Sequence, residues 1–168
     1  TLAGLLAGYF GGLVDWIVMR GADVVLSVPP VLLAIGVVAI LGPSLPNLIL
    51  TIVVLYAPRF ARVAYAAARA VRALDYVLAA VALGAGSTYV LRKAVLPAIV
   101  APLIVQGSLA LGAAMLLESG LSFIGLGVQA PMISWGLMLA EGREYMLTAK
   151  WVVALPGIVN AVPVLSFN

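Results

Sequence analysis

Long stretches without any charged residue alternate with short charged segments along the chain. The uncharged stretches cover residues 1–14, 24–58, 76–91, 94–117, 119–140 and 151–168. The hydrocarbon core of a bilayer is about 30 Å thick and needs roughly 20 apolar residues in a helix. The pattern therefore predicts an all-α fold, a polytopic membrane helix bundle.

The stretch 24–58 is too long for a single span. Its Gly-Pro-Ser-Leu-Pro-Asn segment at 42–47 consists largely of turn-forming residues and divides it in two. Both ends of the sequence lie inside apolar runs, so we interpret the chain as part of a longer membrane protein. The expected spans, full or partial, are 1–14, about 24–41, about 47–62, 94–117 and 151–168.

The stretch 119–140 is uncharged but is a poor helix. It contains four glycines and Pro131, together with serines and Gln129. Irregular backbone at membrane depth is tolerated where protein buries it or where it lines water. We predict a folded, partly re-entrant loop at one membrane face, within an external loop at about 118–150.

The composition excludes several classes of protein. Hydrophobic residues make up 65% of the chain and charged residues 9%. This is too apolar for a soluble globular domain, a disordered chain or a nucleic-acid binder. The absence of Cys and His removes thiol chemistry, zinc–thiolate sites and the usual general base, so we expect no catalytic residues and no metal site.

The basic residues are concentrated in one segment. Between residues 59 and 93 there are six basic side chains and a single acidic one, Asp75. The positive-inside rule places this segment in the cytoplasm. Because successive connections between spans alternate between the two sides of the membrane, 42–47 and 118–150 are then outside. The 15–23 connection then lies inside, although its one Arg against two Asp fits the rule less well. The six basic residues are Arg59, Arg62, Arg69, Arg72, Arg92 and Lys93.

A cytoplasmic connection of this length is unusual between two spans. It is also rich in Ala, which favours helix. A basic, helical segment rich in small residues suits contact with the membrane surface or docking to another protein.

This segment contains a short pattern of small residues. Ala79, Ala80 and Gly84, followed by Leu96 and Pro97, fall at the matching positions of the EAA signature, which the segment therefore resembles. That signature belongs to the permeases of ABC importers. Small Ala side chains allow close approach to a partner, Gly ends the first short helix, and Leu-Pro is expected to break the second. In that family, the resemblance implies, the helix pair docks in a groove of the ATP-binding subunit.

Flanking segments resemble the dipeptide and oligopeptide branch of these permeases. The similarity includes Gly8–Gly12, the run from Leu117 to Gly127, Ser134–Leu139 and the last span. It implies a single permease domain over 1–168 with a coupling loop at about 63–97. Branch members usually have six spans, so the first span, its external segment and the cytoplasmic tail are expected to be missing here.

The chain departs from the signature at its first position, where Leu78 replaces the expected Glu. Asp75, three residues earlier and near the same helix face, is one candidate substitute. The alternative is that Leu78 docks by apolar contact with a matching change in the partner.

Two further residues are candidates for a translocation path or gate. Glu118 ends the 94–117 span, and a carboxyl group at a membrane face can belong to such a path or simply end a helix. Gly107, like Gly112, can instead allow close helix packing. Packing is also the expected role of the Gly4 and Gly8 pair.

These observations favour a permease subunit of an ATP-driven importer, most simply for di- or oligopeptides. The expected partners are a second permease subunit, cytoplasmic ATP-binding subunits, an external solute-binding protein and the bilayer of the cell membrane. The chain has no P-loop lysine motif, so ATP and Mg are expected to bind to the partner subunits. No cofactor is expected to bind to this chain. A secondary transporter or channel is the alternative, but it predicts ionisable residues buried in mid-span. Oligosaccharides and nickel complexes are alternative substrates.

Overall fold

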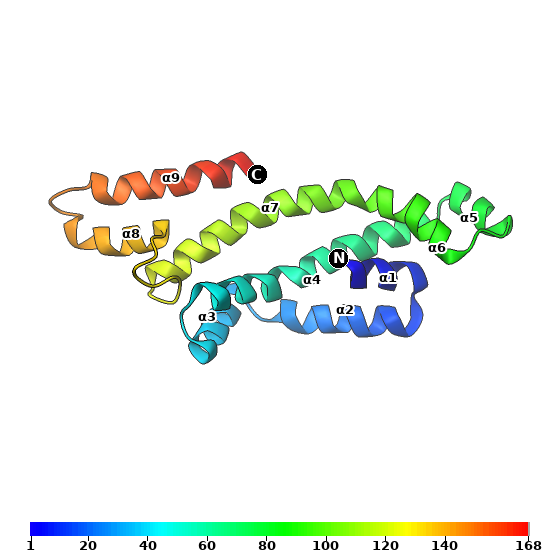
Figure 1. Cartoon of the computed structure of the whole chain (residues 1–168), viewed down its shortest axis with the longest axis horizontal. Helices are drawn as coiled ribbons and strands as arrows, with labels where there is room; N and C mark the ends of the chain where they lie inside the picture. Colours follow the sequence, from blue (N-terminus) through cyan, green and yellow to red (C-terminus); the bar gives the residue numbers. More distant parts are fainter. Residues whose placement is uncertain (168) are drawn as a thin grey trace. The chain divides into compact units, whose positions relative to one another are not determined.

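The computed structural model describes residues 1–167. Within them all regular secondary structure is helical, as the sequence predicted (Figure 1). Contacts divide the chain into two compact units, each discontinuous in sequence. Unit 1 comprises residues 1–27 and 56–107, and unit 2 comprises 28–55 and the segment from 108 onward.

Unit 1 begins with a helical hairpin. Helix α1 (Leu2–Phe10) and helix α2 (Gly12–Ser27) are joined at Gly11, where the chain reverses. Gly11 and Gly12 have φ of 69° and 59°, a left-handed conformation that glycine adopts without steric cost. The 15–23 segment was expected to connect two spans, and this was wrong. It lies inside α2, because the glycines and not the charges end the preceding helix.

Helix α4 (Leu45–Arg72) runs from unit 2 into unit 1. The span expected at about 47–62 is therefore longer than predicted. The first ten residues of the expected coupling loop continue this helix, because the Ala-rich sequence there sustains helix beyond the apolar stretch.

Unit 1 also contains the short helices α5 (Asp75–Ala82) and α6 (Ser87–Val90). Gly84 follows the first of them with φ of 89°, which confirms the predicted helix-ending glycine. The predicted break at Leu96–Pro97 was wrong, because α6 passes through a π-helical turn η1 (Leu91–Val95) directly into α7 (Leu96–Phe123). Pro97 lies in the first turn of α7, and the π-helical hydrogen bonding that precedes it accommodates its missing N–H.

Unit 2 begins at a break in the span expected at about 24–41. Residues Val28 and Pro29 are not helical, and helix α3 (Pro30–Leu41) follows. Proline restricts the residue before it to extended backbone and lacks an N–H, so Pro29–Pro30 stops one helix and starts another.

The predicted turn at 42–47 is confirmed for residues 42–44, whereas 45–47 already form the first turn of α4, and side chains of this segment explain its shape. The Asn47 Nδ2 atom donates to the carbonyl oxygens of Leu41 and Gly42 at 2.7 and 2.9 Å. It thereby satisfies carbonyls that the end of α3 leaves without helical partners. The Ser44 hydroxyl accepts the Asn47 N–H at 3.3 Å and caps the start of α4.

The second part of unit 2 is the end of α7 and a further hairpin. Helix α7 extends to Phe123, so the irregular loop is shorter than the predicted 119–140 and covers 124–134. Helix α8 (Trp135–Gly142), the 3-10 turn η2 (Arg143–Tyr145) and helix α9 (Trp151–Phe167) follow. Helices α8 and α9 lie side by side.

Two of the described helical stretches are long and apolar enough to cross a bilayer, namely α4 and the continuous stretch Ser87–Phe123. Helices α2 and α3 add a third if they are counted as one broken span, and α9 is a shorter apolar helix. Large apolar side chains such as Leu13, Ile40 and Ile104 are exposed along these helices. Such extensive exposed apolar surface is typical of a protein that lipid surrounds.

Candidate functional site

Helix α5 is held to unit 1 by one inward side chain. Val77 is 2% exposed and belongs to a core that includes Tyr9, Val90 and Val95. Its neighbours Leu78 and Ala79 are exposed, and Ala80 is half-buried. The helix therefore presents most of its surface outward while a single valine anchors it.

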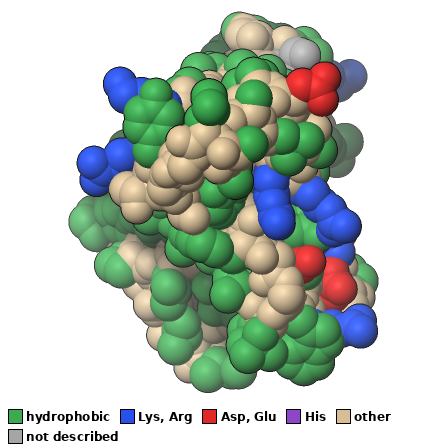
Figure 2. Space-filling view, turned by 90° about the vertical axis from the view of Figure 1, so that its right-hand side faces the viewer, with side chains coloured by type: hydrophobic (Ala, Val, Ile, Leu, Met, Phe, Trp, Pro, Cys, Tyr) green, Lys and Arg blue, Asp and Glu red, His purple; other side chains and the backbone are tan. Residues whose placement is uncertain are grey.

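The outward surface around α5 is mostly apolar. Leu78 is 54% exposed and Leu83 is 90% exposed. We call this surface the α5 face, and it comprises Leu74, Tyr76, Leu78, Val81, Leu83 and Tyr89. Figure 2 views the end of the molecule where α5 and α6 lie and shows Lys and Arg side chains among hydrophobic ones.

A hollow of about 290 Å³ adjoins the α5 face. One wall is formed by the end of α1, so that Tyr9 and Phe10 lie across from Leu78 and Val81. No pattern in the sequence indicated this wall, because α1 and α5 are separated by more than sixty residues. The full lining is Tyr9, Phe10, Arg72, Val77, Leu78, Val81 and Ser87.

The predicted coupling residues fall into two groups. Asp75, Leu78, Ala79, Ala80 and Gly84 lie on α5 and at its end. Asp75 is in the first turn of α5, where the helix dipole favours a carboxylate, and no ion pair forms on it in residues 1–167.

The other two predicted coupling residues, Leu96 and Pro97, start α7 beyond the π-helical turn and are exposed. The two groups are linked through the core, in which Val77 of α5 shares a cluster with Val95 and Ile99.

Arginines of α4, one of them through Tyr65 of the same helix, join α4 to the α1–α2 hairpin. The Arg72 Nη1 atom donates to the backbone oxygen of Tyr9 at 2.8 Å. The Arg69 Nη1 atom donates to the Tyr65 hydroxyl at 2.5 Å, and that hydroxyl donates to Asp15 Oδ2 at 3.0 Å. We call this last set of contacts the Asp15–Tyr65–Arg69 chain.

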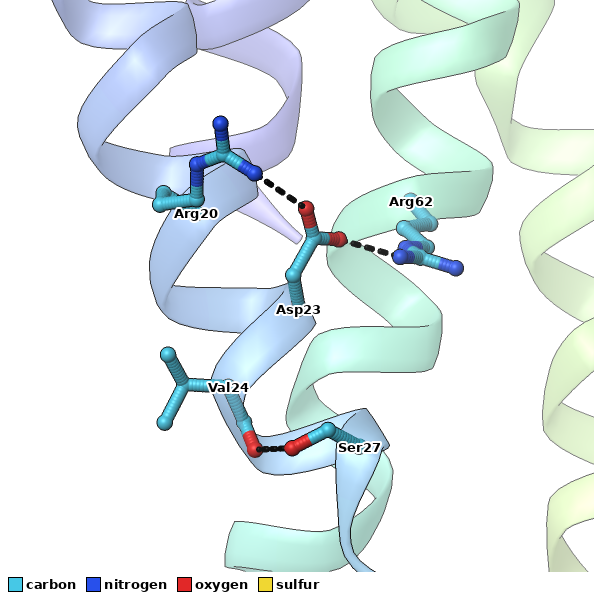
Figure 3. Close-up of polar contacts among 5 residues, drawn as sticks. All are labelled: Arg20, Asp23, Val24, Ser27 and Arg62. Atoms are coloured by element: carbon cyan, nitrogen blue, oxygen red, sulfur yellow. Dashed lines mark hydrogen bonds and ion pairs between the residues drawn. The ribbon is translucent and has the colours of Figure 1, made fainter.

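The third arginine pairs with the second aspartate of α2. Figure 3 shows Asp23 between Arg20 of its own helix and Arg62 of α4. Arg20 lies 3.9 Å from the Asp23 carboxylate. These contacts explain why the 15–23 segment has two acids against one Arg: the acids pair with α4, and sequence patterns alone gave no partner for them.

Close approach of α1 to α4 depends on two glycines. A Cβ atom on Gly4 would overlap the backbone carbonyl of Ala61, and one on Gly8 would lie 2.5 Å from the backbone carbonyl oxygen of Tyr65. The predicted packing role of this pair is confirmed, since backbone cannot move away as a flexible side chain could.

Unit 2 contains a second candidate site around Glu118. The Ser122 hydroxyl donates to Glu118 Oε1 at 2.7 Å, and the Ser119 hydroxyl donates to Oε2 at 3.3 Å. The carboxylate borders a cavity of about 540 Å³ between the end of α7, the following loop and α8. We call it the Glu118 cavity, and its lining is Leu45, Glu118, Val128, Met132, Ile133, Ser134, Trp135 and Met138.

Two glycines fix the backbone beside this cavity. A Cβ on Gly127 would overlap Ser122, and one on Gly136 would overlap the Ser119 backbone. Ser134 caps α8 by accepting the Leu137 N–H at 3.1 Å. The loop that was predicted from its glycines is therefore packed directly against the turn of α7 that carries the carboxylate.

The second path candidate, Gly107, is not among the residues that line either site. A Cβ there would meet nothing within 4 Å in residues 1–167, so no packing role is seen for it. A Cβ on Gly112 would lie 3.5 Å from the Val164 oxygen, an ordinary contact between α7 and α9. Asn160 of α9 was not predicted, yet it is buried and its Oδ1 has no donor within the described residues.

Comparisons with known proteins agree with this architecture. The whole chain, residues 1–168, matches the family described as binding-protein-dependent transport system inner membrane component. The dipeptide transport system permease protein DppC of Alkalihalophilus pseudofirmus is 40% identical over 168 residues, which is 100% of this chain and 55% of that protein.

Two other relatives show the same relationship. The probable D,D-dipeptide transport system permease protein DdpC of Escherichia coli is 41% identical over all of this chain and 56% of its own length. The glutathione transport system permease protein GsiD of Pectobacterium atrosepticum is 38% identical, with the same coverage. The chain thus spans about half the length of the curated relatives it matches. The match over the full length of the chain shows that it belongs to the binding-protein-dependent transport system inner membrane component family and is a membrane protein.

Proposed function

We propose that the chain is part of a permease subunit of an ATP-driven importer for di- or oligopeptides. The observation that carries the proposal is an exposed apolar α5 face at the EAA-like segment of a chain whose relatives are named peptide permeases. ATP would be hydrolysed by partner subunits, and this chain would convert their closure into alternating access. A second permease subunit and a solute-binding protein would complete the complex.

The α5 face is the proposed contact with the ATP-binding subunit. Val77 links α5 to the cluster that contains Val95 and Ile99 near the start of α7. A push on α5 would therefore reach the long helix Ser87–Phe123 through packed side chains. Leu78 would enter an apolar contact, because the α5 face offers six large apolar groups and the Asp75 carboxylate in the first turn of α5 already suits the helix dipole.

Point variants test this contact without removing the core residues of the segment. Full burial of a leucine is worth about 1.5–3 kcal/mol, so Leu78→Ala should weaken binding of the ATP-binding subunit about tenfold or more. The measurement is co-purification with the tagged, full-length permease, together with the ATPase rate in nanodiscs. Leu147→Ala is the control, since Leu147 is 93% exposed in unit 2. Unchanged co-purification for Leu78→Ala and Leu78→Arg would contradict the assignment.

The orientation can be tested separately, because the chain has no native cysteine. Ala79→Cys should react with a membrane-impermeant maleimide only after spheroplasts are opened. Glu141→Cys, on exposed surface of α8, should react in intact spheroplasts. The reverse pattern would show that the α5 face is external and could not meet a cytoplasmic ATPase.

A further inference from the structure

The Glu118 cavity has the chemistry of a ligand site. Its volume of about 540 Å³ falls in the range of about 300–1,000 Å³ found for small-molecule sites. Seven of its eight lining residues are uncharged and most are apolar, so Glu118 supplies the only formal charge.

The carboxylate has capacity for a further partner. An ionised carboxylate has about four acceptor positions, and Ser119 and Ser122 occupy two of them. No Lys or Arg pairs with it in residues 1–167. A half-buried charge without a countercharge is costly, so a cation that enters the cavity gains an ion pair while it relieves that cost.

The other walls suit an apolar body of variable shape next to the cation. Met132 and Met138 are flexible and polarisable, and such side chains adapt to different apolar groups. Trp135 adds an aromatic face that can attract a cation or stack on a ring. The combination is one fixed anionic anchor with adaptable apolar walls.

We propose that the Glu118 cavity binds the amino-terminal ammonium group and first side chain of the transported peptide. Every unblocked peptide carries that ammonium group, whereas its side chains differ, which matches the fixed anchor and the adaptable walls. The assignment rests on the proposed function and deepens it by naming the part of the substrate that is recognised.

Photo-crosslinking tests the site in the complete importer, reconstituted in nanodiscs of phosphatidylglycerol and phosphatidylcholine. The probes are the dipeptide p-benzoylphenylalanyl-alanine and its N-acetyl derivative, since benzophenone reacts readily with methionine. Adducts on Met132 and Met138 are measured by mass spectrometry. A charge-assisted hydrogen bond is worth about 1.5–3 kcal/mol, so the free amine should label about tenfold more than the acetylated probe.

Variants separate the carboxylate from general effects of charge. Glu118→Gln keeps an acceptor for the serine hydroxyls and should reduce the preference for the free amine to about twofold or less. Glu141→Gln removes an exposed carboxylate of α8 that does not line the cavity, and should leave the preference intact. Equal labelling by both probes in the wild type, or an unchanged preference in Glu118→Gln, overturns the proposal.

A competition experiment needs no variant. Phenylethylamine should suppress labelling, and phenylpropionate at the same concentration should not. Phosphatidylethanolamine carries the same primary ammonium group, so suppression by this lipid but not by phenylethylamine would identify a lipid site and overturn the peptide assignment.

Peptide-stimulated ATP hydrolysis by the same preparation, measured with its solute-binding protein, tests the proposed function separately. Stimulation without any preference for the free amine overturns only the site. A preparation that lacks stimulation by any peptide overturns the proposed function and, with it, the assignment of this ligand.

Discussion

The two units of the chain are built from different contacts. Unit 1 contains seven basic and three acidic side chains, and both aspartates of α2 bond to α4, Asp23 to Arg62 and Asp15 to the Tyr65 hydroxyl. Unit 2 contains two basic and three acidic side chains, and its only acid with a side-chain hydrogen bond in the described residues, Glu118, has hydroxyl partners. Both units, however, bring backbone against backbone at glycines. Glycine packing is thus common to the two, whereas the ion pairs formed within residues 1–167 all lie in unit 1.

The comparison predicts that enlarging a packed glycine damages either unit. Gly4→Ala in unit 1 and Gly136→Ala in unit 2 place a Cβ inside the van der Waals distance of backbone. Overpacking of this kind costs about 1–3 kcal/mol or more, so both variants should lower the thermal unfolding midpoint of the full permease in nanodiscs.

Matched controls lie in the neighbouring helices. A Cβ on Gly21 of α2 or on Gly120 of α7 meets nothing within 4 Å. Alanine in a helix interior is favoured over glycine by about 1 kcal/mol, so Gly21→Ala and Gly120→Ala should hold or raise the midpoint. If Gly4→Ala behaved like Gly21→Ala, the close approach of α1 to α4 would be wrong.

A smaller effect is expected from the Asp15–Tyr65–Arg69 chain of unit 1. Tyr65→Phe removes the hydroxyl that connects Asp15 to Arg69, and should destabilise the permease by about 1 kcal/mol in the same unfolding assay. Tyr145→Phe in unit 2 is the control, since its hydroxyl has no partner within residues 1–167 and should change nothing. Equal losses for the two variants would remove the contrast between the units.

The smallest effect is expected from the Asp23–Arg62 pair. Both side chains are about half-exposed, so a double-mutant cycle with Asp23→Ala and Arg62→Ala should give a coupling energy of no more than about 1 kcal/mol. The coupling should fall at high salt, because salt screens exposed charges. The changes in unfolding free energy caused by Arg62→Ala and by Glu141→Ala, which lie in different units, should be additive. A coupling that salt leaves unchanged would indicate a buried pair instead.

Features that depend on local chemistry were predictable from the sequence. The turn between α3 and α4 follows from the Gly, Pro, Ser and Asn content of 42–47, and Gly84 ends α5 because it can adopt a positive φ. The four-residue spacing of Gly4 and Gly8 places both on one helix face, so a packing role could be expected before the partner helix was known.

The limits of the helices were less predictable, because charged residues were taken as the ends of spans. Asp15 and Asp23 lie within α2, where they bond to Tyr65 and Arg62 of α4. These partners are 50 and 39 residues away in the sequence. Pairing over such a distance leaves no mark on local hydropathy. The end of α4 at Arg72 has a related cause, because alanine continued the helix past the apolar stretch.

The sequence by itself determined an apolar, helical membrane chain with a basic segment, a set of turn residues and an EAA-like pattern. Each of these depends on transfer of side chains into lipid or on backbone preferences within a few residues. Tertiary structure decided which helices share an interface, why two aspartates are tolerated in α2, and what surrounds Leu78 and Glu118. Those outcomes depend on side chains that are distant in sequence, and only the packing of the helices within each unit brings them together.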